Sequence, residues 1–275
     1  MRVHIEDDFD LEKIADCGQC FRAKEVEAGI YRFITNKNVI YIKKLRENTF
    51  DVSCDNYEWQ SIWENYFDLA TDYRSIRREI SEVNDYFKDA AQLGAGIRIL
   101  KQDIFETLIS FIISQRKSIP SIKTSVERIA EKYGKPINTI YETVYTFPTL
   151  DEMKAASLLQ LSTCALGYRA EYIKDAVEKV YEGLVDLEEL KSKRDDDQIV
   201  EELKKIRGVG NKVANCVALF AYHRVDRVPI DVWIDRVINE DWAGHNFFAK
   251  LTHNAGIAQQ YVFYSNRFAD INDIP

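Results

Sequence analysis

Two glycines between two helical stretches place the strongest constraint on how this 275-residue chain can fold. Gly208 and Gly210 enclose a single valine, and apolar residues recur at helical spacing on both sides, over about residues 199–222. Glycine adopts the left-handed backbone that so short a connection needs, and Ala214 is small enough to let the two helices approach closely. We therefore predict a helix-hairpin-helix unit.

Free backbone N–H groups at the start of the second helix are expected to face outward beyond this hairpin. Such groups carry the positive end of the helix dipole and bind phosphate, so a DNA backbone is the ligand we expect near Gly208 and Gly210. Lys212 lies in the first turn of that helix. By itself it is equally explained as a simple phosphate contact in a protein that binds DNA without catalytic activity.

A carboxylate about twenty residues further on adds a catalytic interpretation to that of a phosphate contact. Pro229 ends the preceding segment, and Asp231 stands at the predicted N-cap of a new amphipathic helix. An aspartate there can be a plain helix cap. It can also stabilise the positive charge that develops on a sugar when an N-glycosidic bond breaks, while a neutral lysine attacks C1′ to form a Schiff base.

Lys212 followed by Pro229-Ile230-Asp231 resembles the signature of the helix-hairpin-helix DNA glycosylase superfamily, in which a Gly/Pro-rich loop ends in Asp. In that superfamily, a lysine at the Lys212 position marks enzymes that both excise a base and cleave the strand. The resemblance therefore implies a bifunctional base-excision glycosylase and lyase, with Lys212 and Asp231 as its catalytic residues.

Cysteine spacing separates the branches of that superfamily. The five cysteines, at positions 17, 20, 54, 164 and 216, are too scattered for a disulfide framework. Endonuclease III-type enzymes carry four closely spaced cysteines after the aspartate helix, whereas none follows Cys216 here, so we expect no iron–sulfur cluster. The chain resembles instead the 8-oxoguanine DNA glycosylases, as a bacterial member. A glycosylase for an oxidised pyrimidine or an alkylated purine, and a non-catalytic DNA binder, remain alternatives.

Other segments resemble the substrate site of that family. Cys17-Gly18-Gln19-Cys20-Phe21-Arg22 is similar to its Gly-Gln-Ser-Phe-Arg loop, which implies that the Gly18 carbonyl accepts from the N7–H found only in oxidised guanine. Gln259 and Phe263 lie four residues apart, hence on one helical face. The resemblance implies that Gln259 reads the Watson–Crick edge and that Phe263 stacks on the base, with Cys216 as the opposite wall. Core packing explains Phe263 and Cys216 equally well when each is taken alone.

The same resemblance implies contacts with DNA outside the base pocket. Tyr168 maps to an aromatic wedge that enters the base stack, and Arg169 to its neighbour facing the orphaned base. Arg116 and Lys117 stand where the eukaryotic pattern has asparagines, and we expect them to contact the undamaged strand or its phosphates.

Two departures concern the family's other DNA contacts. The arginine that helps recognise the opposite cytosine is replaced by Ser121, so the preferred opposite base is in doubt. The phosphate-contacting histidine is replaced by Trp233, which can still donate through its indole N–H.

Alternating apolar and polar residues predict the architecture of the first part of the chain. Residues 30–35 and 39–44 form a predicted hairpin, a further strand is expected at 50–53, and helical periodicity covers 57–79. We predict an α+β protein, with an N-terminal antiparallel-sheet α/β domain over residues 1–90 and a mostly α-helical domain over residues 91–275, without a strand pair. Helices are predicted in the second domain at 103–115, 119–132, 150–156, 168–182, 187–193, 197–206, 212–222, 231–239 and 255–267.

The formal net charge of −8 argues against holding DNA by bulk electrostatics. Helix N-termini and a local basic face can still bind phosphate. No apolar run suits a secretion signal or a membrane span, so we expect a cytoplasmic protein without membrane contact. We expect a monomer that acts on double-stranded DNA containing an oxidised purine. No metal or organic cofactor is expected, and a monovalent cation at the hairpin carbonyls is left open.

Overall fold

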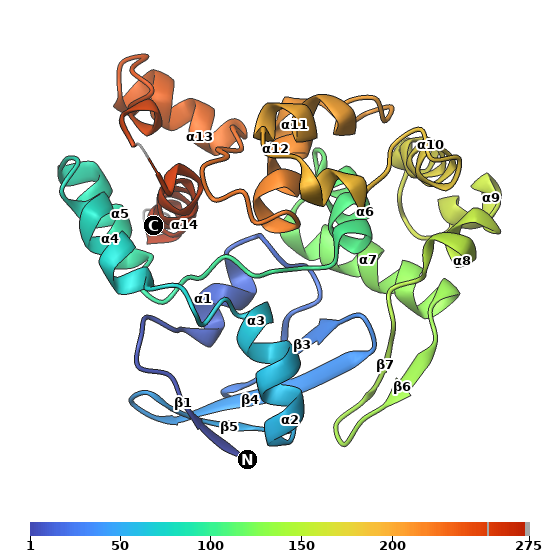
Figure 1. Cartoon of the computed structure of the whole chain (residues 1–275), viewed down its shortest axis with the longest axis horizontal. Helices are drawn as coiled ribbons and strands as arrows, with labels where there is room; N and C mark the ends of the chain where they lie inside the picture. Colours follow the sequence, from blue (N-terminus) through green and yellow to red (C-terminus); the bar gives the residue numbers. More distant parts are fainter. Residues whose placement is uncertain (252, 273–275) are drawn as a thin grey trace.

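The computed structural model describes residues 1–251 and 253–272, with side chains as far as Arg267 (Figure 1). A five-stranded antiparallel sheet lies at the base of the molecule in this view, and most of the helices lie above it. The predicted α+β class, with an N-terminal sheet followed by a helical part, is confirmed. The strands are β1 (Arg2–His4), β2 (Lys24–Glu27), β3 (Ile30–Thr35), β4 (Asn38–Arg46) and β5 (Thr49–Val52), in the spatial order β1-β5-β4-β3-β2.

The predicted hairpin forms the centre of this sheet. β3 and β4 pair from Ile30 and Lys43 to Thr35 and Asn38. Asn36 in the turn has a φ of 52°, a left-handed conformation that asparagine tolerates. β1 and β2 are not predicted by the sequence because strands of three and four residues are too short to show a clear alternation.

The helices follow the predicted order, with several differences in length and type. The N-terminal part contains α1 (Leu11–Asp16), α2 (Asn56–Glu58), the π-helix η1 (Trp59–Trp63), α3 (Glu64–Tyr66), α4 (Tyr73–Ser81) and α5 (Asp85–Leu93). The remainder contains α6 (Ile104–Ser114), α7 (Ile119–Tyr133), α8 (Leu150–Lys154), α9 (Leu158–Ser162), α10 (Arg169–Tyr181), the 3-10 helix η2 (Glu189–Ser192), α11 (Asp196–Leu203), α12 (Asn211–Phe220), α13 (Val232–Arg236), the π-helix η3 (Val237–Asp241), the 3-10 helix η4 (Phe247–Lys250) and α14 (Ala255–Asn272).

Three expectations about these elements are wrong. The helical part does contain a strand pair, β6 (Pro136–Asn138) with β7 (Thr143–Tyr145), whose three-residue strands give no readable alternation. Helical periodicity over 57–79 does not produce one helix, because the chain turns at Asp68, where φ is 52° and the buried carboxylate accepts from the hydroxyl of Tyr73 at 3.0 Å. The predicted set of helices is also incomplete, because α1, α5 and α9 lie outside it.

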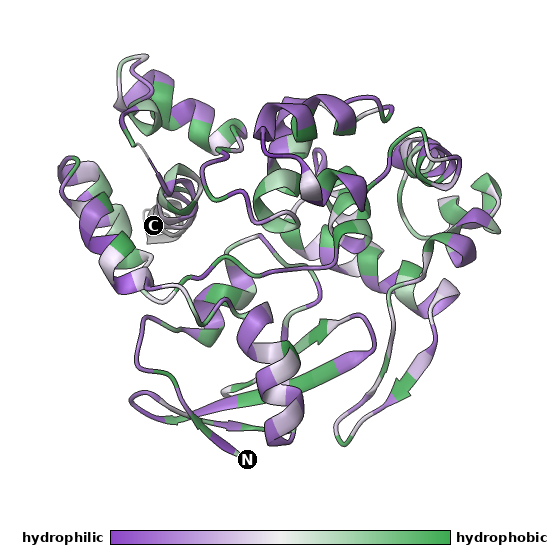
Figure 2. Ribbon diagram, in the orientation of Figure 1, coloured by the Kyte–Doolittle hydropathy of each residue, from purple (hydrophilic) through white to green (hydrophobic). Residues whose placement is uncertain are grey.

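Buried side chains form two clusters. The smaller one packs the sheet against the α2–α3 segment and includes Phe33, Trp63 and Phe67. The larger one fills the helical part, and it also takes in Tyr73 of α4 and Phe87 of α5. In Figure 2, α6 in the helical part is largely green, and residues 107–113 of this helix are all buried. The ends of α6 and α12 are therefore held by a continuous apolar core.

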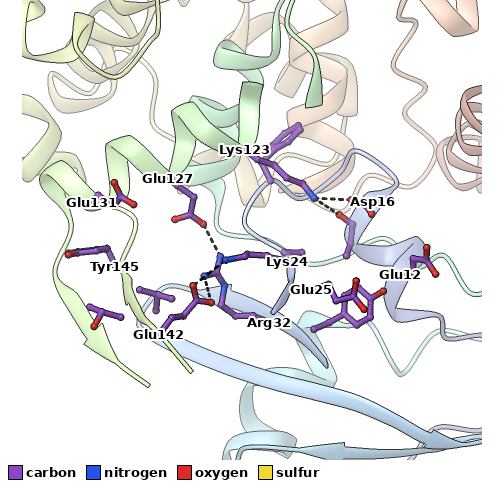
Figure 3. Close-up of a pocket in the computed structure, with 16 residues that line it drawn as sticks. Glu12, Asp16, Lys24, Glu25, Arg32, Lys123, Glu127, Glu131, Glu142 and Tyr145 are labelled. Atoms are coloured by element: carbon purple, nitrogen blue, oxygen red, sulfur yellow. Dashed lines mark hydrogen bonds and ion pairs between the residues drawn. The ribbon is translucent and has the colours of Figure 1, made fainter. Parts of the chain in front are cut away.

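Charged side chains tie β3 to the helical part beside a small pocket of about 310 Å³ (Figure 3). The guanidinium of Arg32 donates to Glu127 on α7 and to Glu142 in the β6–β7 turn, both at 2.9 Å. Arg22 also donates to Glu127, at 3.2 Å, and its carbonyl accepts from Arg32 at 3.1 Å. These contacts fix the loop that precedes β2 against α7. Removal of one partner from such a buried network costs about 3–5 kcal/mol.

Among the residues that the structure describes, no helix combines the length and the apolar composition that crossing a membrane requires. No group of three or more His, Cys, Asp or Glu side chains in these ranges is arranged to hold a metal ion.

Candidate active site

A pocket of about 850 Å³ lies between the end of α6, the turn that follows it, and the helices α12, α13 and α14. Gly18 and Phe21 contribute to it from the loop after α1. Segments that are far apart in the sequence therefore meet at one place. The predicted site residues that line the pocket are Gly18, Arg116, Lys117, Gly210, Lys212, Asp231, Trp233 and Phe263.

The charge of this lining differs in sign from the charge of the whole chain. Even without Lys212, the described lining carries three cations, Arg116, Lys117 and Arg267, but only two carboxylates. A local positive field can attract a polyanion although the net charge is −8. The charge objection raised by the composition therefore does not apply at the pocket.

Lys212 is held at the start of α12 over an aromatic floor. Gly210 is the N-cap of this helix, so Lys212 is in its first turn, and its side chain is half-buried. Its Nζ lies 5.4 Å from the centre of the Phe111 ring, which in turn stacks on Phe220 at 5.4 Å. The amine therefore lies over Phe111 at the pocket.

Asp231 is both a helix cap and a pocket residue. Its Oδ1 accepts from the backbone N–H of Trp233 at 3.1 Å and of Ile234 at 2.9 Å, so the predicted N-cap is confirmed. Burial raises the pKa of Asp231, and the N–H of Ile234 and the charge of Lys212 offset part of this effect. Among the ion pairs of the described residues, none joins Asp231 to Lys212, although the two side chains line one pocket and their charges interact.

Gly18 and Phe263 adjoin each other in the pocket. Gly18 has a φ of 79°, and a Cβ added there would lie 3.2 Å from Cε1 of Phe263. Any larger residue at position 18 would therefore narrow the space beside the ring. Phe263 is half-buried on α14, so part of its ring remains available for stacking on a planar ligand.

Gln259 and Cys216 lie behind the pocket wall rather than on it. Gln259 is 2% exposed, and its Oε1 accepts from Gln260 at 3.0 Å. Presentation of its amide to a base therefore requires a side-chain movement. Cys216 lies one turn after Lys212 on α12, and burial raises the pKa of its thiol despite the neighbouring cation. The predicted roles of both residues in base binding stay predictions.

Gln19 is a positioning residue that the sequence does not single out. Its buried side chain donates to the carbonyl of Arg98 at 2.7 Å and accepts from the N–H of Leu100 at 2.8 Å. Its own carbonyl accepts from Gln102 at 2.9 Å. These bonds fix the loop that carries Gly18 to the segment before α6. The local sequence around Gln19 gives no indication of this positioning role, because its hydrogen-bond partners are about eighty residues away.

The predicted DNA contacts divide into exposed and buried side chains. Tyr168, just before α10, is 49% exposed, as a wedge residue must be, and Arg116 is also exposed. Trp233 is half-buried at the pocket. Arg169, by contrast, is 7% exposed, and the ammonium of Lys117 is bonded within the protein. A role for these last two as direct DNA contacts stays a prediction.

Two family models match this chain in succession. The model described as 8-oxoguanine DNA glycosylase, N-terminal domain, matches residues 2–108, and the model described as HhH-GPD superfamily base excision DNA repair protein matches residues 109–253. The crystal structure of the Clostridium acetobutylicum 8-oxoguanine glycosylase/lyase in its apo form is 36% identical, over 96% of this chain and 95% of that one, with a TM-score of 0.89. The chain belongs to the 8-oxoguanine DNA glycosylase family.

Further relatives extend this finding. The Clostridium acetobutylicum enzyme in complex with double-stranded DNA containing cytosine opposite 8-oxoguanine is 34% identical over 98% of both chains, with a TM-score of 0.89. The probable N-glycosylase/DNA lyase of Methanothermobacter thermautotrophicus is 28% identical, over 99% of this chain and 98% of its own length. The expected DNA partner is thereby supported for this member of the 8-oxoguanine DNA glycosylase family.

The two hairpin glycines of this family member have different local environments. Gly208 has a φ of 82°, and a Cβ there would lie 2.3 Å from the ring of Tyr172. Gly210 has an extended backbone, and a Cβ there would meet no atom within 4 Å. Gly208 is thus required by the fold, whereas the open space at Gly210 suits close approach of a phosphate.

Alanine at each glycine should separate these two requirements. We expect Gly208→Ala to lower the free energy of unfolding by about 1–3 kcal/mol, because it adds backbone strain and a clash with Tyr172. Gly210→Ala should change stability by less than about 0.5 kcal/mol but weaken binding of duplex DNA several-fold. Urea unfolding and fluorescence anisotropy measure the two effects. Equal loss of stability in both variants would contradict this assignment.

A monovalent cation at the hairpin would need backbone oxygen ligands. No N–H of the described chain donates to the carbonyls of Gly208 or Val209, so such oxygens are present. These two carbonyls would hold the cation, and it would add positive charge beside a DNA phosphate. The cation itself stays a prediction.

Proposed function

We propose that this protein is a bifunctional DNA glycosylase that removes 8-oxoguanine from duplex DNA and then cleaves the strand by β-elimination. The observation that carries the proposal is the pocket in which Lys212 and Asp231 lie together with Gly18 and Phe263. Relatives named N-glycosylase/DNA lyase and 8-oxoguanine glycosylase/lyase support it. We further propose that the substrate is double-stranded DNA containing an oxidised purine, and that the protein acts as a monomer in the cytoplasm.

The first chemical step is displacement of the base. The bond between C1′ and the base nitrogen breaks with its electron pair on the base, and positive charge develops on the sugar. The Asp231 carboxylate stabilises this charge, and the neutral amine of Lys212 forms a new bond to C1′. The proton that the amine then loses balances the negative charge of the departing base.

The second step cuts the strand. Ring opening of the lysine adduct gives a protonated Schiff base, which acidifies the hydrogens on C2′. Loss of one C2′ proton is followed by cleavage of the bond between C3′ and the phosphate oxygen, and the phosphate leaves with the electron pair. Water later releases Lys212 from the unsaturated sugar.

We assign discrimination for the oxidised base to Gly18 and Phe263, which adjoin each other in the pocket. The ring of Phe263 provides the stacking face, and the Gly18 carbonyl is the acceptor for the N7–H of 8-oxoguanine. Across the described residues no donor reaches that carbonyl, so it is available for this bond. Guanine has no hydrogen on N7 and would leave the acceptor unsatisfied.

Excision rates for 8-oxoguanine opposite each of the four bases test the proposal. Ser121 is exposed on α7 and its hydroxyl accepts from Ser118 at 3.2 Å, so it offers no bidentate contact to an opposite base. Such a contact is worth about 1–3 kcal/mol, and without it we expect the four rates to lie within about tenfold of one another. Duplexes with a single oxidised pyrimidine or alkylated purine serve as comparison. Faster excision of either lesion would favour the alternative glycosylase, and the absence of any base release dependent on Asp231 would favour a non-catalytic DNA binder.

A further inference from the structure

Arg169 joins two segments that border the pocket. Its Nε donates to the carbonyl of Gln115 at 2.8 Å, and its Nη2 donates to the carbonyls of Gln115 and, at 3.3 Å, Arg116. Its Nη1 donates to the carbonyl of Leu166 at 3.2 Å. The guanidinium also lies 4.5 Å from the centre of the Tyr168 ring. Four of the five N–H donors of this buried arginine are therefore used inside the protein.

Lys117 makes a second connection between the same two segments. Its Nζ donates to the carbonyl of Ala165 at 2.7 Å and to the hydroxyl of Ser125. Ser125 donates in turn to the carbonyl of Ala165, at 3.3 Å. Burial, together with the neighbouring charge of Arg169, lowers the pKa of Lys117. We call the pair of side chains Arg169 and Lys117 the clamp.

Arg116 precedes Lys117 in the turn that the clamp holds, but its side chain differs from those of both clamp residues. Its φ is 51°, a left-handed conformation that is strained in a residue with a Cβ. Its side chain is exposed and lines the pocket. The hydrogen bonds from the clamp to the carbonyls of Gln115, Arg116 and Ala165 account for the persistence of this strained turn, because they are lost if the turn relaxes.

We propose that Arg169 and Lys117 are positioning residues, and that the cation which this turn presents to DNA is Arg116. This inference rests on the proposed function in one respect, since it takes DNA to be the ligand that enters the pocket. It departs from the role that the family resemblance implies for Arg169, which is direct contact with the orphaned base. The four hydrogen bonds that Arg169 donates to backbone carbonyls leave it a single N–H for that contact.

Salt dependence of DNA binding distinguishes a contact from a positioning residue. Each phosphate neutralised by a protein cation contributes about 0.9 to the slope of log affinity against log salt concentration. The probe is a duplex that contains one tetrahydrofuran abasic analogue, which cannot form a Schiff base and therefore reports binding alone. We expect Arg116→Gln to reduce the slope by about 0.9 and the affinity roughly tenfold near 0.1 M salt.

Comparison of single variants with double variants in the Arg116→Gln background decides between the two roles. In wild-type protein, Arg169→Met and Lys117→Met should each weaken binding, but by no more than Arg116→Gln does. In the Arg116→Gln background, either change should alter neither the slope nor the affinity further, because no side chain remains to be positioned. Lys44→Gln is the matched control, since Lys44 is exposed on β4 and does not line the pocket. It should leave both quantities unchanged.

Three outcomes would overturn the inference. A further slope reduction of about 0.9 in the double variant would make Arg169 or Lys117 a direct DNA contact. Unchanged affinity in a folded Arg169→Met or Lys117→Met variant would leave these residues with a structural role only. An unchanged slope in Arg116→Gln would remove Arg116 from the interface. A wild-type protein that binds the duplex but excises nothing would contradict the proposed function, while the slopes would still decide the roles of these three residues.

Discussion

In a Lys212→Gln variant, borohydride no longer traps a covalent complex with duplex DNA containing 8-oxoguanine, and strand cleavage falls by at least about a thousandfold. The reason is that the amide of glutamine cannot form a Schiff base, although it matches the lysine stem in its first three carbons. Its position in the first turn of α12 and its packing over Phe111 should be preserved. Gel separation of the trapped complex and of the cleaved strand measures both effects.

Lys204→Gln provides the matched control for this experiment. Lys204 lies at the end of α11, in the first half of the same helix-hairpin-helix unit, and pairs with Glu201 at 2.8 Å. It does not line the pocket, so trapping and cleavage should persist. A trapped complex that survives in Lys212→Gln would reassign the nucleophile. Lys117 would then be examined next, because it is the other lysine of the described lining.

The parts of the site that the sequence predicts are those encoded by neighbouring residues. The hairpin glycines, Lys212 in a first turn and Asp231 at an N-cap each depend on fewer than about ten consecutive positions, and the structure places all of them as predicted. The hairpin of β3 and β4 follows in the same way from alternation around a turn residue that tolerates positive φ. Local geometry of this kind is determined by local sterics.

Features that depend on distant partners could not be predicted. The β6–β7 strands are stabilised partly through Glu142, whose partner Arg32 is 110 residues away. The direction of the Arg169 side chain is set by carbonyls of a turn more than fifty residues earlier. An arginine next to an exposed tyrosine gives no indication of this, because both a surface cation and a buried one satisfy the local pattern. The sequence consequently predicts contact with DNA for Arg116, Lys117 and Arg169, although the hydrogen bonds favour only Arg116.

The second large effect concerns Asp231. We expect Asp231→Asn to lower the rate of base excision about 10²–10⁴-fold, because asparagine cannot stabilise the positive sugar by charge. The helix cap should persist, since the amide oxygen can still accept from the N–H groups of Trp233 and Ile234. Asp235→Asn is the matched control, because Asp235 lines the same pocket but is exposed, and it should retain most of the activity.

The pH dependence of the same variant separates a catalytic carboxylate from a plain cap. Burial raises the pKa of Asp231, so the active ionised form is lost, as the pH falls, earlier than an ordinary aspartate would lose its charge. The wild-type excision rate should therefore show an acidic limb that the residual activity of Asp231→Asn lacks. A folded-state pKa above the unfolded one also means that stability falls as the pH rises from the unfolded-state pKa, and that the loss is complete above the folded-state pKa. Asp231→Asn should consequently be as stable as wild type at pH 7, or more stable, in urea unfolding. An Asn variant that loses stability but keeps its excision rate would make Asp231 a helix cap and nothing more.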